Sequence, residues 1–112
     1  MKITRVSESN IADTPHKMDV RKLYDADSAQ IMHITLQPGQ ALKPHITPVD
    51  VTFYILEGTP EVLVGEERIV VQADSLVESP KDIVHCLYNN SEKPARILVI
   101  KAPKPTSQAK MI

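Results

Sequence analysis

The residues of this sequence best suited to chemistry are histidines, of which the chain has four. An imidazole binds divalent metals and transfers protons near neutral pH, so two imidazoles directed at one cavity can support either chemistry. His45 and Thr47 have the same parity along the chain, and in a strand they share one face. His16, flanked by a proline and a lysine, is expected to be solvated and is assigned no function.

Strands rather than helices are expected to position these side chains, because apolar residues recur with a period of two. Residues 31–36 and 51–56 show this alternation most clearly and are rich in β-branched types. Proline, glycine and asparagine interrupt the chain at short intervals, which is typical of a sandwich or barrel of short strands. The sharpest local prediction is a hairpin over residues 61–71, in which Gly65 opens a two-residue type II′ turn.

Length and composition predict one globular domain. The chain has 112 residues, 42% of them apolar and 24% charged, which is enough for one core. The net charge of −1, with both signs scattered, argues against nucleic acid and against a membrane surface as partners. No apolar run approaches bilayer-spanning length and no signal core is visible, so a cytoplasmic location is expected. Cys86 is expected to be a buried apolar residue, and Lys101, Lys104 and Lys110 to contribute only solubility.

Two sets of residues follow a recognisable spacing. The first set consists of Gly39, His45 after five residues, and Gly58. The second set consists of Pro80, His85 and Asn89. In their order along the chain and in the separation between them, the two sets resemble the two motifs of the cupin family. Aspartate replaces the family's glycine at positions 74 and 82, a mild change because aspartate also tolerates turn conformations.

The resemblance implies a fold and a domain layout. It implies an all-β chain folded as a cupin-type double-stranded β-helix, a jelly-roll-like antiparallel barrel. Residues 1–112 then form a single cupin domain, with a barrel core at about 19–101 and an extended C-terminal tail over 102–112.

The resemblance also implies a metal site, which this sequence retains only in part. His45 and His85 match ligand positions for a divalent ion such as iron, manganese, zinc or nickel, whereas Thr47 and Val51 replace a histidine and a glutamate. Losing the carboxylate removes a large electrostatic attraction, so we expect weak or absent metal binding. His33 is the candidate third ligand. Its orientation is left open, because both faces of its strand are apolar.

Three functions follow from an incomplete site. The first is binding of a small molecule in a pocket lined by Thr47, Val51, Phe53, Ile55 and Leu87. The second is a metal-dependent oxygenase or isomerase that uses His45 and His85 as ligands. The third is a metal-free acid–base enzyme in which one of these histidines moves a proton.

A homodimer is also expected, because a short barrel leaves sheet edges that pairing would cover. Residues 18–24 alternate in polarity and are the candidate for such an edge or for the first barrel strand.

Overall fold

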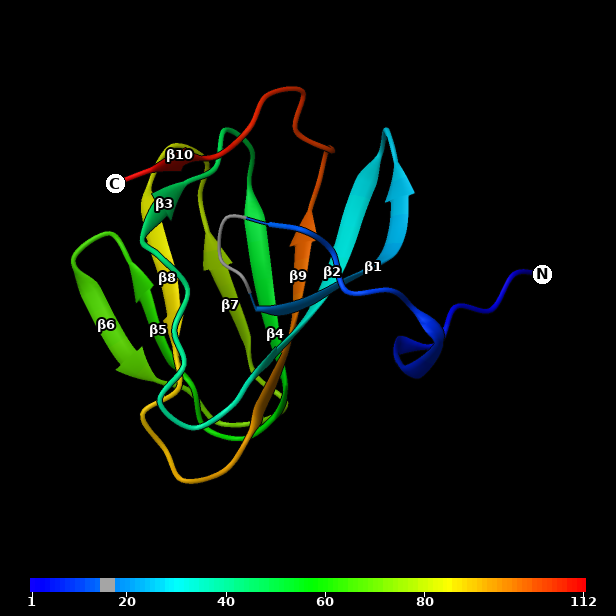
Figure 1. Ribbon diagram of the computed structural model, residues 1–112. Coiled ribbons are helices and arrows are strands. Elements are labelled where there is room, and N and C mark those ends of the chain that lie inside the picture. The colour runs from blue at the N-terminus through cyan, green and yellow to red at the C-terminus, as the bar shows by residue number, and fades with distance from the viewer. Residues whose placement is uncertain (15–17) are drawn as a thin grey trace.

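Two antiparallel sheets facing each other make up the computed structural model, which describes residues 1–14 and 18–112 (Figure 1). The first sheet has the order β1-β2-β9-β4-β7, with strands β1 (Asp19–Ala26), β2 (Ala29–Leu36), β9 (Ala95–Lys101), β4 (Val51–Glu57) and β7 (Leu76–Ser79). The second has the order β10-β3-β8-β5-β6, with strands β10 (Lys110–Met111), β3 (His45–Ile46), β8 (Val84–Tyr88), β5 (Glu61–Val64) and β6 (Glu67–Val70). The one helical element in the described chain is a 3₁₀ turn, η1 (Val6–Glu8). This architecture confirms the predicted all-β, jelly-roll-like fold.

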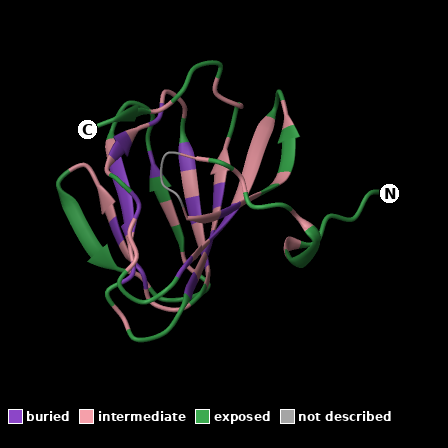
Figure 2. Ribbon diagram, in the orientation of Figure 1, coloured by how far each residue is buried: buried purple, intermediate pink, exposed green. Residues whose placement is uncertain are grey.

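The core lies between the two sheets because each strand directs every second side chain inward. In β4, for example, Val51, Phe53 and Ile55 are buried while the residues between them are not. Figure 2 shows the buried residues gathered on the inner strands and the exposed edge strand β6. Among the described residues, no helix is long and apolar enough to cross a membrane.

Turn geometry agrees with the sequence at three positions. Strands β5 and β6 pair with Val64 opposite Glu67, and Gly65 has φ +63°, so the predicted two-residue hairpin is confirmed. Asp74 and Asp82 both have φ +62°. These aspartates therefore adopt the left-handed conformation that the family's glycines would supply at the same points.

Both chain ends return to the barrel. The segment before β1 forms a bridge from Ile11 to Arg21, and β1 is both the first strand and an edge of its sheet. The segment after Lys101 was expected to be an extended tail. Instead it crosses one end of the barrel, where β10 pairs with β3 (Figure 1, red). The pairing satisfies backbone groups that β3 would otherwise expose at a free edge.

Candidate functional site

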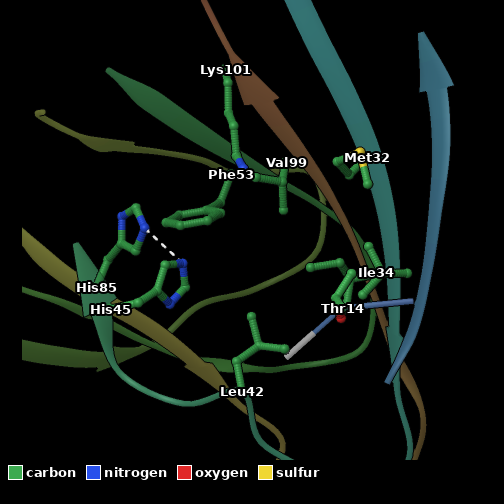
Figure 3. A pocket seen from close by; sticks show the side chains of 10 residues that line it. Thr14, Met32, Ile34, Leu42, His45, Phe53, His85, Val99 and Lys101 are labelled. Atoms are coloured by element: carbon green, nitrogen blue, oxygen red, sulfur yellow. Dashed lines mark hydrogen bonds between the residues drawn. The ribbon is translucent and has the colours of Figure 1, made fainter. Parts of the chain in front are cut away.

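The two motif histidines meet in space. Strands β3 and β8 pair with His45 opposite His85, so both side chains leave the sheet on the same face. Their Nε2 atoms are 3.1 Å apart, and the ring of Phe53 packs edge-on against His85 with 5.3 Å between ring centroids (Figure 3). The structure therefore brings together the pair that the sequence singled out.

Hydrogen bonds orient both imidazoles. His45 Nδ1 lies 2.8 Å from the carbonyl oxygen of Lys43, which can only accept, so Nδ1 carries the hydrogen. In the neutral pair, His45 Nε2 is then an acceptor and receives the Nε2–H of His85. The remaining Nδ1 of His85 accepts from the Ser79 hydroxyl at 2.7 Å, and Thr47 Oγ1 lies 3.0 Å from His85 Nε2. The Lys43 carbonyl and the Ser79 hydroxyl thus hold the pair in a defined tautomer.

A cavity opens beside the imidazoles. Its inner hollow, of about 100 Å³, is bordered by His45, His85 and Lys101 and by the apolar side chains of Val20, Met32, Ile34, Leu42, Phe53 and Val99 (Figure 3). An outer hollow of about 310 Å³ lies against residues of the returning C-terminal segment, including Pro105, Gln108 and Met111. The two hollows share Thr14, His45 and Lys101. Residues near both chain ends therefore border the site.

Lys101 is a residue that lines the cavity and that sequence reasoning missed. It ends β9 with the same parity as Ala95, Ile97 and Val99, so its side chain enters the cavity (Figure 3). Its amine forms no hydrogen bond or ion pair with any described residue, and burial lowers the pKa of that amine. The parity was visible in the sequence, which assigned this lysine only a contribution to solubility, whereas the structure places its side chain against the cavity.

Lys101 also acts on the imidazole pair through its charge. Burial lowers the pKa of His45, the hydrogen bond to the Lys43 carbonyl opposes that shift, and the nearby positive charge of Lys101 lowers the pKa further. Burial and the charge of Lys101 therefore both favour a neutral His45. The electrostatic environment of the cavity is one that disfavours cations.

His33 does not join the pair. Its neighbours Met32 and Ile34 line the inner hollow, so the alternation of β2 directs His33 to the opposite face of the sheet. There it is buried and accepts a hydrogen bond of 3.1 Å from Arg96 Nε. Burial lowers the pKa of His33, and the Arg96 charge lowers it further. The structure thus removes His33 as a third ligand.

The expected pocket residues divide into two groups. Phe53 lines the inner hollow and Thr47 lines the outer one. Val51, Ile55 and Leu87 are buried in the core and border neither hollow, because at their positions the two sheets fill the space between them. Cys86 is buried, as expected. His16 lies outside the described residues.

The donor set fits a tightly held divalent ion poorly. Two imidazole nitrogens bound to one ion lie roughly 2.9 to 3.4 Å apart, and the observed 3.1 Å between the Nε2 atoms meets this condition. However, residues 1–14 and 18–112 contain no cluster of three or more histidine, cysteine or carboxylate groups. No carboxylate in that part of the chain lines either hollow, and the amine of Lys101 enters the same cavity. Two neutral nitrogens beside an amine do not compensate a double positive charge.

The fold and the cavity define a β-barrel that opens at one end onto two histidines. The sequence matches the cupin domain family over residues 32–101, which is more than half of the chain, and the chain belongs to this family. No curated protein matches the sequence.

Solved structures agree with this assignment. The protein TT1209 from Thermus thermophilus is 32% identical, with a TM-score of 0.80 over 94% of this chain and 100% of that chain. The polyketide cyclase RemF from Streptomyces resistomycificus is 19% identical, with a TM-score of 0.85 over 100% of this chain and 85% of that chain. An RmlC-like cupin from Methanocaldococcus jannaschii is 20% identical, with a TM-score of 0.77 over 92% of this chain and 91% of that chain. The last two likenesses show the fold alone.

Proposed function

We propose that this cupin binds a small, largely apolar molecule that carries one anionic group, such as a short carboxylate. The observation that carries the proposal is the amine of Lys101, which enters an apolar cavity without a partner among the described residues. A buried ammonium without a counterion is unfavourable, so an anion placed beside it restores the lost interaction. The apolar side chains of the inner hollow would hold the body of the ligand.

The imidazole pair supports the same ligand class. Because His45 Nδ1 is committed to the Lys43 carbonyl, the Nε2 edge of the pair is the edge that faces the cavity. A carboxylate oxygen placed beside Lys101 can accept a hydrogen bond from its ammonium, and the Nε2–H of His85, which the neutral pair donates to His45, becomes a second donor to the ligand where that bond opens. The outer hollow leaves room for a ligand longer than the inner hollow can hold.

Lys101→Met is expected to remove the stabilisation of the fold by a carboxylate ligand. For the unsubstituted protein, hexanoate or benzoate at about 100 times its dissociation constant should raise the free energy of unfolding by about 2.7 kcal/mol. Thermal unfolding followed by circular dichroism measures this, since the chain has no tryptophan. Methionine keeps the unbranched shape of the side chain to within one atom of its length and removes its charge, so the effect reports the ammonium.

Two controls sharpen this test. Lys81→Met makes the same charge change at an exposed position and should leave the stabilisation intact. The uncharged amides of the same acids should stabilise the unsubstituted protein less than the acids do. Equal stabilisation of Lys101→Met and the unsubstituted protein by the acids would overturn the proposal.

A metal-dependent oxygenase or isomerase is the second candidate function, favoured by the 3.1 Å spacing of the two Nε2 atoms. Under the first proposal, protein dialysed without chelator is expected to hold well under one equivalent of iron, manganese, zinc or nickel. The reason is that two imidazoles without a carboxylate hold such ions weakly. Elemental analysis measures the content. One full equivalent, lost in both His45→Ala and His85→Ala, would favour the metal-dependent enzyme instead.

We also propose that two copies of the chain form a homodimer through a sheet edge. The edge strands β6 and β7 carry the exposed apolar side chains of Ile69, Val70 and Leu76, which pairing would cover. Light scattering of the eluted protein should give twice the chain mass, and a stable monomer at high concentration would refute the proposal.

A further inference from the structure

Lys101 differs from Lys22 and Lys104, whose amines form ion pairs. Lys104 forms an ion pair of 2.7 Å with Asp25, and Lys22 pairs with the same carboxylate at 3.2 Å. The amine of Lys101 has no such partner in the described chain and borders both hollows. It is therefore a primary amine held in a cavity that a small molecule can enter.

The surroundings of this amine favour its unprotonated form. Phe53 and Val99 place apolar surface beside it, and burial lowers the pKa of the Lys101 amine relative to an exposed lysine. A larger fraction of the side chain thus carries the nitrogen lone pair at neutral pH. An amine activated in this way attacks carbonyl carbon.

We propose that the Lys101 amine forms an imine with a small aldehyde or ketone bound in the inner hollow. The inference rests on the proposed binding function, because the same apolar walls must hold the carbonyl compound. It adds a covalent step to that function. The substrate class is a carbonyl compound with a short apolar body.

The step is balanced without a further reactant. The nitrogen lone pair forms a bond to the carbonyl carbon, and a proton moves from nitrogen to oxygen to give a carbinolamine. The carbon–oxygen bond then breaks, and the oxygen leaves as water with the second nitrogen proton, which gives the carbon–nitrogen double bond. The imidazoles of His45 and His85 border the same hollow and are the described groups that can carry these protons.

Reductive trapping tests the proposal. The protein is incubated with pentan-2-one and sodium cyanoborohydride, and its mass and tryptic peptides are measured. One trapped adduct adds the mass of the ketone without its oxygen. We expect modification at Lys101 to exceed that at each exposed lysine by about tenfold or more, because the hollow holds ketone and amine together. Equal modification of Lys101 and the exposed lysines would overturn the proposal, and this comparison needs no variant.

Lys101→Arg separates this inference from the proposed function. Arginine keeps the positive charge but does not form the imine, so carboxylate stabilisation should persist while the trapped adduct at this position is lost. Lys81→Met should still be modified at Lys101. If no preferred adduct forms but Lys101→Met loses carboxylate stabilisation, the imine is refuted and the anion site stands. Circular dichroism of each variant establishes that it is folded.

Discussion

Replacing Gly58 with alanine is expected to lower the free energy of unfolding by about 3 to 4 kcal/mol. Gly58 follows β4 with φ +82°, where an L side chain is strained. A Cβ atom there would lie 2.6 Å from the carbonyl oxygen of Pro94 and 2.9 Å from the Cα of Ala95. Both atoms belong to the backbone that leads into β9, so neither moves aside without displacing a central strand. Chemical denaturation followed by circular dichroism gives the change.

Gly39 provides a matched control for this substitution. It has nearly the same conformation, with φ +85°, but a Cβ there would meet no atom within 4 Å. Gly39→Ala should therefore cost only the conformational strain, about 1 kcal/mol. Equal losses of unfolding free energy in Gly58→Ala and Gly39→Ala would show that the steric contact of a Cβ at position 58 does not destabilise the protein.

Asn89→Ala is expected to cost about 2 to 4 kcal/mol of unfolding free energy. The Asn89 side chain is fully buried, and its amide donates to the carbonyls of Leu36 and Lys93 at 2.9 and 2.8 Å. Its oxygen accepts from the backbone N–H and the hydroxyl of Ser91. Alanine would leave these groups short of partners and open a gap at the end of β8. The midpoint of thermal unfolding should fall by roughly 10 °C.

The neighbouring Asn90 is the control for this loss. Its amide donates to Glu61 at 2.8 Å, but the contact is exposed, so water replaces it after substitution. Asn90→Ala should change stability by no more than about 0.5 kcal/mol. Comparable losses of unfolding free energy in Asn89→Ala and Asn90→Ala would contradict the explanation that burial makes the hydrogen bonds of Asn89 important for stability.

The sequence predicted local conformation correctly where that conformation depends on residues adjacent in the chain. Period two predicted the strands, and Gly65 predicted the hairpin turn that the register of β5 and β6 confirms. Asp74 and Asp82 adopt the positive φ expected of glycine substitutes. In each case the conformation depends on the residue itself and on those adjacent to it.

The orientation of side chains across sheets needed the tertiary structure. Both faces of β2 are apolar, so the sequence left His33 undecided, and only the packing of the other sheet shows that Met32 and Ile34 face inward. The same limit explains why Val51, Ile55 and Leu87 were expected in the pocket. Which inward residues border an opening, and which are covered, depends on how closely the two sheets approach along their length.

The sequence by itself indicated the cupin fold and the pair of histidines, because two motifs with the family's spacing resemble those of cupins. Turn residues and parity along each strand, which are local properties, indicated only the all-β barrel or sandwich. The tertiary structure alone decided what accompanies that pair. It brought the amine of Lys101 into the cavity, turned His33 away and laid the C-terminal segment across the opening. These placements join residues far apart in the chain, and they arise from strand register and packing between sheets, which no local pattern encodes.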